Sequence, residues 1–200
     1  MIDNVAALRA LYAQPKERAL RKQLDRLDVH CMRFIALSPF VVVATGRADG
    51  MLDSSPRGGE PGFVKAPDGR TLLIPDSPGN NRLDSMSNII ETGRIGLLFL
   101  IPGIDETLRV NGTARLADEP EALAHFAGAA RAPKLAIEVS VEEAYLHCAK
   151  SLMRSKLWAP ASLRERSVLP TMGQMLKDQT GSSSPAESQE AMVARYAADL

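Results

Sequence analysis

The sequence has no long apolar run and no excess of charge of either sign. Its longest apolar stretch, Ile95 to Ile101, is interrupted by Gly96 and is far shorter than the roughly 20 residues of a membrane-spanning helix. The 24 basic and 24 acidic side chains balance, so no global basic excess favours a nucleic-acid partner. We therefore expect neither a membrane nor a nucleic acid among its partners.

Cysteine is also scarce, with two in 200 residues. The N-terminal segment lacks the basic start, apolar middle and small-residue cleavage site of a secretory signal. We therefore expect a cytoplasmic protein with free thiols. The cysteines lie in the pairs His30-Cys31 and His147-Cys148. Adjacent side chains on a helix diverge by about 100°, and neither pair has Cys-x-x-Cys spacing, so we predict no metal site.

Short apolar or alternating runs at close spacing predict about six strands, with helices between and outside them. This order is typical of a small antiparallel barrel rather than an alternating α/β sheet. The predicted fold class is mainly β with flanking helices (α+β). The predicted strands are Phe40–Gly46, Met51–Ser55, Arg70–Pro75, Ile95–Ile101 (expected to be buried on both faces), Glu106–Ala117 and a last strand with Leu135, Ile137, Val139 and Val141 on its apolar side.

Helical periodicity and capping residues predict the helices and the division of the chain. We expect N-terminal helices that pack on the barrel in residues 1–38, the barrel in 39–158 and a C-terminal helical arm in 159–200. The predicted helices are Asn4–Tyr12, Pro15–Leu27, Val29–Leu37, Arg82–Glu91, Asp118–Gly128 (with a capping box from Asp118 to Glu121), one with Tyr145, Cys148, Ala149 and Leu152 on one face, a short one within Ser167–Gln179, and a last one capped by Ser184 and ending near Ala198.

The segment Glu106–Ala117 alternates regularly. Leu108, Val110 and Gly112 fall on one face, and Arg109 and Asn111 fall on the other. Asn111-Gly112 is also a typical hairpin turn, but the alternation continues through it. We therefore predict one strand, with a glycine where another backbone or a ligand comes close.

The stretch Gly79-Asn80-Asn81-Arg82 precedes a predicted helix. Free backbone N–H groups and the positive end of the helix dipole make such a junction a potential anion site. Asn81 is the expected cap, and Arg82, at the first helical position, would reach a phosphate with a charge-assisted contact. The alternative is an ordinary capped helix with a solvated arginine.

Several separated motifs occur together in one order. They are Ser55-Pro56-Arg57-Gly58 with Pro61-Gly62-Phe63-Val64, Pro75-Asp76, Gly79 to Arg82, Ile101-Pro102-Gly103, Glu106 to Gly112, His147 to Lys150 and Leu169 to Gln174. Together they resemble the pyridoxamine 5′-phosphate oxidase-like family of FMN-binding split β-barrels, and within it a subgroup described as FMN-dependent enzymes.

The resemblance implies a set of flavin contacts. Ser55, Pro56, Arg57 and Gly58 would run beside the flavin ring, although the residues alone also fit a tight turn with an exposed arginine. Arg109 and Asn111 would approach the flavin across a subunit boundary, or would face solvent. Trp158 would cap the pocket, or would belong to the core. The segment that would hold the ribityl chain and phosphate contributes Pro75, Asp76, Asn80, Asn81 and Arg82, where better-known oxidases use a Ser/Arg/Lys cluster.

The resemblance further implies a homodimer with FMN at the subunit interface and hydride or electron transfer to a small-molecule substrate. The ending Arg195 to Leu200 lacks the basic substrate motif of the true oxidases, so vitamin B6 phosphate oxidation is not expected. No P-loop, dinucleotide fingerprint or Ser/His/Asp arrangement is present, and no catalytic residue is assigned. The alternative is a non-catalytic flavin- or haem-binding or regulatory split-barrel protein.

Overall fold

The structure is a computed structural model that describes residues 1–197 and residue 199. Contacts within the chain divide it into two compact units, Met1–Ser155 and Lys156–Leu200. The first unit holds all the strands of the sheet, and the second consists of short helices. The predicted division into helices, barrel and arm at residues 38 and 158 stays a prediction.

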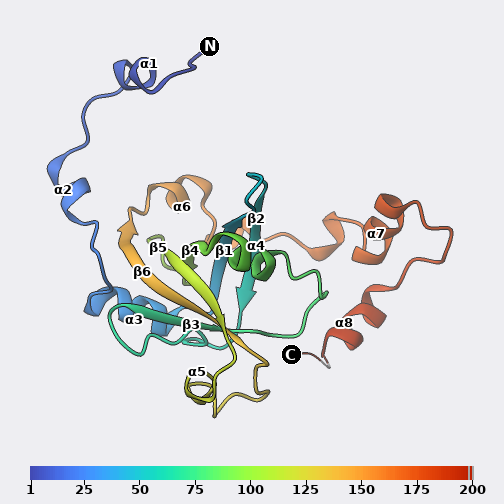
Figure 1. Cartoon of the computed structure of the whole chain (residues 1–200). Coiled ribbons are helices and arrows are strands. Elements are labelled where there is room, and N and C mark those ends of the chain that lie inside the picture. The colour runs from blue at the N-terminus through green and yellow to red at the C-terminus, as the bar shows by residue number, and fades with distance from the viewer. Residues whose placement is uncertain (198, 200) are drawn as a thin grey trace. The chain divides into compact units, whose positions relative to one another are not determined.

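Six antiparallel strands form one sheet in the first unit, in the order β2-β1-β4-β5-β6-β3. The sheet curls into a half-barrel, which confirms the predicted split-barrel fold (Figure 1). The strands are β1 (Phe40–Gly46), β2 (Leu52–Gly58), β3 (Thr71–Pro75), β4 (Arg94–Leu100), β5 (Thr107–Ala117) and β6 (Ala136–His147).

Alternate residues of the strands point into the core, as the period of two requires. In β1, Val41 and Val43 are fully buried, while Phe40 and Ala44 are exposed on the other face. Pro56 lies inside β2, where it is tolerated because β2 stands at one end of the strand order and pairs only with β1.

The prediction that Ile95–Ile101 is buried on both faces is wrong. Ile95, Leu97 and Phe99 are buried, whereas the alternate residues of β4 are only half-buried or exposed. The apolar run is continuous because Leu98 and Leu100 lie on the outer face of the sheet, beside Val42 and Phe40 of β1. The outer face of β1 and β4 therefore carries apolar side chains that this unit covers only in part.

Asn111-Gly112 lies within β5, as predicted, and not in a hairpin turn. The pairing with β6 shifts by one residue at this point, where Asn111 faces Glu143 and Gly112 faces Val141. A Cβ added to Gly112 would overlap the Ser140 carbonyl oxygen. The glycine is therefore required by the close approach of another backbone.

The helices of the first unit are α1 (Val5–Ala10), α2 (Glu17–Arg21), α3 (Val29–Leu37), α4 (Asp84–Thr92), α5 (Pro120–Ala124) and α6 (Lys150–Ser155). The two N-terminal helices are shorter than predicted and contain no buried residue. The third matches its predicted range and buries Cys31, Phe34 and Ile35. Helix α4 packs against β1, β2, β4 and β5.

Two predicted helix starts near β5 and β6 are wrong. The fifth helix begins after Glu119 and not after Asp118, and no side chain caps it. Strand β6 continues to His147, so Tyr145 lies on a strand and only the residues from Lys150 onward are helical. Because His147 still pairs with Thr107 of β5, strand β6 extends beyond the segment in which apolar residues alternate.

The second unit contains η1 (Pro160–Ser162), η2 (Arg166–Val168), α7 (Met172–Thr180) and α8 (Gln189–Ala197). The cap of the last helix is Ser188, whose hydroxyl accepts from the Ala191 N–H, and not Ser184 as predicted. The predicted end near Ala198 lies outside the described residues. In the described part of the chain, no helix has the length and apolar character to cross a membrane.

Candidate functional site

The Ser-Pro-Arg-Gly stretch forms the second half of β2 and not a turn. Asp53, Ser55 and Arg57 lie half-buried on one face of the strand, and Pro56 and Gly58 lie exposed on the other. The register with β1 places the half-buried face opposite Val41, Val43 and Thr45. The sequence therefore presents an acid, a hydroxyl and a base in a row beside the core.

Strand β2 is linked to the first turn of α4 by hydrogen bonds. The Ser85 hydroxyl, which is 2% exposed, donates to an Asp53 carboxylate oxygen over 2.5 Å. The Ser55 hydroxyl donates to the same carboxylate, and an Arg57 Nη lies 3.4 Å from Ser85 Oγ. Sequence reasoning missed Asp53 and Ser85, because nothing in the sequence indicates that these segments meet.

The entry to α4 has an unusual backbone. Asn81 and Leu83 both have positive φ angles, 56° and 59°, and the helix begins at Asp84. The prediction that Asn81 caps the helix and Arg82 opens it is therefore wrong by two residues. Leu83 occupies the cap position and provides no side-chain hydrogen bond. The first backbone N–H groups of α4 are thus left without a side-chain cap.

The loop before α4 orders itself through local contacts. The Arg82 N–H donates to Asn80 Oδ1 (3.0 Å), and Arg82 Nε donates to Asp84 Oδ2 (2.7 Å). The bond to Asp84 and its charge raise the pKa of Arg82, and Asp53 adds to this effect. The loop therefore places Arg82 within the electrostatic reach of β2.

Pro75 and Asp76 stand at the start of the same loop. Pro75 pairs with Ala136 at the end of β3, and the Asp76 N–H donates to the Leu135 carbonyl (3.0 Å). From Ser77 to Asp84 every residue is exposed. The backbone at both ends of the loop is thus fixed, by β6 at the beginning and by α4 at the end.

Arg109 and Asn111 form a second group on the outer face of the sheet. An Arg109 Nη donates to the Tyr145 hydroxyl (3.0 Å), and Asn111 Nδ2 donates to Glu143 Oε1 (2.9 Å). Gln23, from the segment after α2, donates to the other Glu143 oxygen over 2.6 Å. The sequence indicated that β5 carries polar residues here, but not their partners on β6.

The predicted flavin contacts thus fall into two groups within the first unit. The loop before α4 and β2 come together, whereas Arg109 and Asn111 lie on the outer face of β5, which Arg57 does not share. Trp158 lies in the second unit, where it is half-buried. Its assignment to the flavin stays a prediction.

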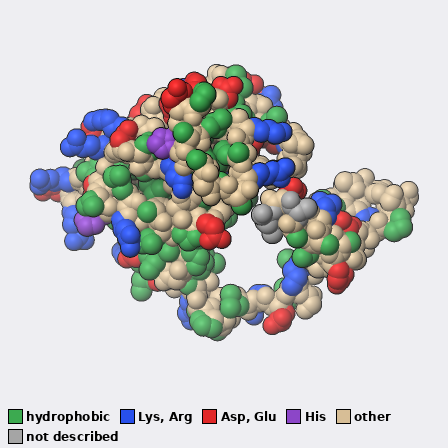
Figure 2. Space-filling model, turned by 90° about the horizontal axis from the view of Figure 1, so that it is seen from below, with side chains coloured by type: hydrophobic (Ala, Val, Ile, Leu, Met, Phe, Trp, Pro, Cys, Tyr) green, Lys and Arg blue, Asp and Glu red, His purple; other side chains and the backbone are tan. Residues whose placement is uncertain are grey.

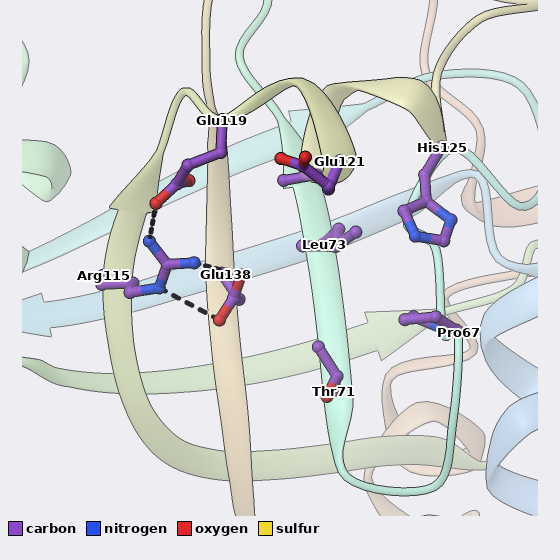
Figure 3. A pocket seen from close by; sticks show the side chains of 9 residues that line it. Pro67, Thr71, Leu73, Arg115, Glu119, Glu121, His125 and Glu138 are labelled. Atoms are coloured by element: carbon purple, nitrogen blue, oxygen red, sulfur yellow. Dashed lines mark hydrogen bonds and ion pairs between the residues drawn. The ribbon is translucent and has the colours of Figure 1, made fainter.

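A hollow of about 330 Å³ lies between α5, β3 and β6 (Figure 3). Arg115 stands between Glu119 and Glu138 and donates to both, while Glu121 and His125 project from the helix side. The bonds to Glu138 and Glu119 raise the pKa of Arg115. None of the predicted site residues lines this hollow.

A second hollow, of about 470 Å³, lies between α3 and the segment Gly62–Ala66 and is lined mainly by apolar side chains. Figure 2 shows one face of the molecule, on which exposed hydrophobic side chains lie among charged ones. Within residues 1–197 and 199, no three His, Cys, Asp or Glu side chains are grouped so that they could hold a metal ion.

Residues 27–148 match the family model for pyridoxamine 5′-phosphate oxidase, which is more than half of the chain. The chain belongs to the pyridoxamine 5′-phosphate oxidase-like family of split barrels. This family binds flavins and includes flavin-dependent oxidoreductases. The match begins at the buried Leu27, ends just after β6 and contains both groups of polar residues described above. No protein with a curated description matches the sequence.

Two solved structures of HupZ have a fold similar to that of the barrel. A single-residue variant of HupZ from Group A Streptococcus superposes with a TM-score of 0.51 at 20% identity, covering 60% of this chain and 99% of HupZ. A second HupZ structure gives 0.50 at 20% identity, covering 60% and 93%. An FMN-binding protein from Syntrophomonas wolfei gives 0.44 at 11% identity, covering 58% and 81%. At these identities the two HupZ structures establish the fold alone.

Proposed function

We propose that this protein is an FMN-dependent oxidoreductase that acts on a small molecule. The observation that carries the proposal is the junction of β2 with the start of α4. There, an uncapped helix N-terminus, Arg82 and Arg57 lie within the residues that match the family model. FMN supplies hydride or electron transfer when it is bound, and the residues of the chain bind and orient it.

The start of α4 suits the phosphate of FMN. No side chain caps its first turn, so backbone N–H groups and the positive helix end are available to an anion. Arg82 adds a guanidinium whose Nε is held by Asp84, which leaves its two Nη groups for a phosphate. Asn80 and Asn81 add amide donors from the exposed loop.

Strand β2 suits the flat part of the cofactor. The Ser55 and Arg57 side chains share one face of the strand, and the Arg57 guanidinium is steered by Ser85 and by its neighbouring Pro56 carbonyl. Both of these partners are neutral, and the Asp53 carboxylate on the same face of the strand carries the charge opposite to that of Arg57. Ser55, Pro56, Arg57 and Gly58 are the proposed contacts of the ring.

We further propose a homodimer in which the outer face of the sheet meets a second copy. This face carries the exposed apolar side chains of Phe40 and Leu52 and the half-buried one of Leu98. Leu52 is 85% exposed, which is unusual for a strand leucine. Two copies that cover this face would bring Arg109 and Asn111 to the flavin of the partner. The two unpaired thiols favour a reducing compartment such as the cytoplasm.

The experiment is the visible spectrum of the purified protein, followed by titration of the flavin-free form with FMN. We expect Arg82→Ala to weaken FMN binding by on the order of 2 kcal/mol, through loss of a charge-assisted phosphate contact. Arg109→Ala, which removes a contact from only one side of the ring, should weaken it less. Equal affinity of both variants and the wild type would refute the phosphate assignment.

Two further measurements separate the parts of the proposal. Reduction of the bound chromophore by NAD(P)H or by a substrate panel distinguishes an enzyme from a protein that only holds flavin. Sedimentation of the flavin-bound and flavin-free protein across a dilution series tests the dimer, which FMN should stabilise if it binds only the assembled form. A monomer that holds flavin would refute the site between subunits.

A further inference from the structure

The Tyr145 ring lies close to two cations from distant parts of the sequence. The Lys22 ammonium is 5.2 Å from the centroid of the ring and the Arg109 guanidinium carbon is 5.6 Å from it. The His147 ring lies 4.9 Å away on the same strand. We call these four residues, Lys22, Arg109, Tyr145 and His147, the β6 cluster.

The fold holds Lys22 in this position through backbone contacts. Leu24 forms a two-way bridge with Ala144, in which each N–H donates to the other carbonyl over 3.0 and 2.9 Å. The Lys22 ammonium itself donates to the Leu146 carbonyl over 2.6 Å. The segment after α2 is therefore tied to β6 at three successive residues, because Gln23 also bonds to Glu143.

The β6 cluster has more hydrogen-bond donors than acceptors. In the part of the chain that the structure describes, the Lys22 ammonium has one acceptor for three N–H groups. Arg109 reaches the Tyr145 oxygen and, weakly at 3.4 Å, Asn111 Oδ1. The Tyr145 hydroxyl accepts from Arg109, and its own hydrogen has no described acceptor.

The neighbouring carboxylate of Glu143 offsets only one of the two positive charges of Lys22 and Arg109. Both oxygens of Glu143 already accept short hydrogen bonds, from Asn111 (2.9 Å) and Gln23 (2.6 Å). Its distance of 3.9 Å from Arg109 Nε is at the limit of an ion pair, and among the described residues no ion pair joins it to Lys22. The two cations near the Tyr145 ring are therefore accompanied by one carboxylate, whose oxygens already accept hydrogen bonds from two amides.

We propose that Lys22, Arg109 and the Tyr145 hydroxyl form an anion-binding site that holds the carboxylate or phosphate group of the substrate. Its role in substrate binding rests on the proposed function, since Arg109 also joins the cluster to Asn111, a proposed flavin contact. The site selects anionic small molecules over neutral ones. Carboxylates and phosphates share the required chemistry, because both accept several charge-assisted hydrogen bonds.

His147 reports on the occupation of the site. Burial lowers the pKa of its imidazole, and the charges of Lys22 and then Arg109 lower it further. An anion bound between these cations would cancel part of their effect, so the pKa of His147 should rise on binding. The signal of His147 is assigned by comparison with a His147→Asn variant, because the chain has only three histidines.

The experiment is calorimetric titration with inorganic phosphate and with succinate at fixed ionic strength, on flavin-free and FMN-saturated protein. The test variants are Lys22→Met and Tyr145→Phe, neither of which changes a proposed flavin contact. Lys16→Met is the matched control, because it removes the same charge from an exposed residue without a side-chain cap bond. We expect each test variant to weaken binding about tenfold, the control to leave it unchanged, and phosphate to raise the pKa of His147 in the wild type.

The possible results separate this inference from the proposed function. Normal FMN binding with equal phosphate and succinate affinities in all variants would overturn the anion site and leave the flavin site intact. Phosphate or succinate binding that depends on Lys22 and Tyr145 in a protein that takes up no FMN would support the anion site and overturn its role beside a flavin. An unchanged pKa of His147 at saturating anion would place the anion elsewhere and would also overturn the inference.

Discussion

Ser85, in the first turn of α4, donates its hydroxyl hydrogen to Asp53 of β2 over 2.5 Å. Ser85 is buried and Asp53 is half-buried, and the bond connects the two segments proposed to hold the cofactor. We expect Ser85→Ala to lower the free energy of unfolding by about 2 kcal/mol, because it leaves a carboxylate with one partner fewer. Denaturant unfolding monitored by circular dichroism measures the change.

Ser87→Ala is the control for this prediction. Ser87 lies in the same helix, is exposed and has no side-chain hydrogen bond in the described part of the chain. Its substitution should change the free energy of unfolding by less than about 0.5 kcal/mol. Equal effects of the two substitutions would show that the Ser85–Asp53 bond contributes nothing specific.

Gly112→Ala should be strongly destabilising. A Cβ at this residue would overlap the Ser140 carbonyl oxygen, and the strands would have to separate to admit it. We expect a loss of about 3 kcal/mol in unfolding free energy. Gly128→Ala is the matched control, since a Cβ there meets no atom within 4 Å. A difference of less than about 1 kcal/mol between the two variants would contradict the bulged pairing of β5 with β6.

The two cysteines should differ sharply in reactivity. Cys31 is buried in α3, and burial raises the pKa of its thiol to about 11, so the reactive thiolate is scarce at neutral pH. Cys148 is exposed. A colorimetric thiol reagent should therefore modify one thiol per native chain and two per unfolded chain. Native Cys148→Ser protein should not react, and rapid modification of that variant would contradict the buried position of Cys31.

Asp28 should contribute stability that depends on pH. Its carboxylate caps α3 by accepting from the Cys31 N–H (2.8 Å), and this bond lowers the pKa of Asp28 below its ordinary 3.8. Because the folded pKa is the lower one, the contribution is full above 3.8 and is lost as pH falls through the folded pKa. Asp28→Ala should cost about 1 kcal/mol at neutral pH, and this cost should shrink in acid.

Asp28→Asn separates the cap from the charge. Asparagine retains a side-chain oxygen for the Cys31 N–H but does not titrate, so its stability relative to Asp28→Ala should stay constant between neutral pH and about pH 3. Chemical unfolding at several pH values provides the comparison. A cost of Asp28→Ala that does not change across this range would show that the carboxylate charge plays no part.

The elements with strong local signals were predictable. Phe40–Gly46 and Val29–Leu37 match their predicted ranges, because apolar β-branched residues and an Asp cap leave few alternatives. The alternation from Thr107 to Ala117 was sufficient to place Gly112 inside a strand. In these cases the local preference and the tertiary environment agree.

The errors lie where long-range pairing decides the structure. Tyr145, Cys148, Ala149 and Leu152 have the spacing of a helix face, but the pairing of eleven β5 residues with β6 holds Tyr145 to His147 in a strand. Leu83 occupies a left-handed cap position that its propensity disfavours, because the loop must turn into α4. Tyr145 and Lys22 lie near opposite ends of the sequence of the first unit, and no sequence spacing indicates that they are in contact.

The strand order has a consequence for synthesis on the ribosome. Strand β3 pairs with β6, whose residues follow it by more than 60 positions, as Pro75 and Ala136 show. At roughly 5–20 residues per second, Leu72, Leu73 and Ile74 emerge several seconds before the segment that covers their hydrogen-bonding edge. During this interval the three apolar side chains lack the strand that pairs with them in the folded protein, so the nascent segment around β3 is the part of the sheet that completes its pairing late.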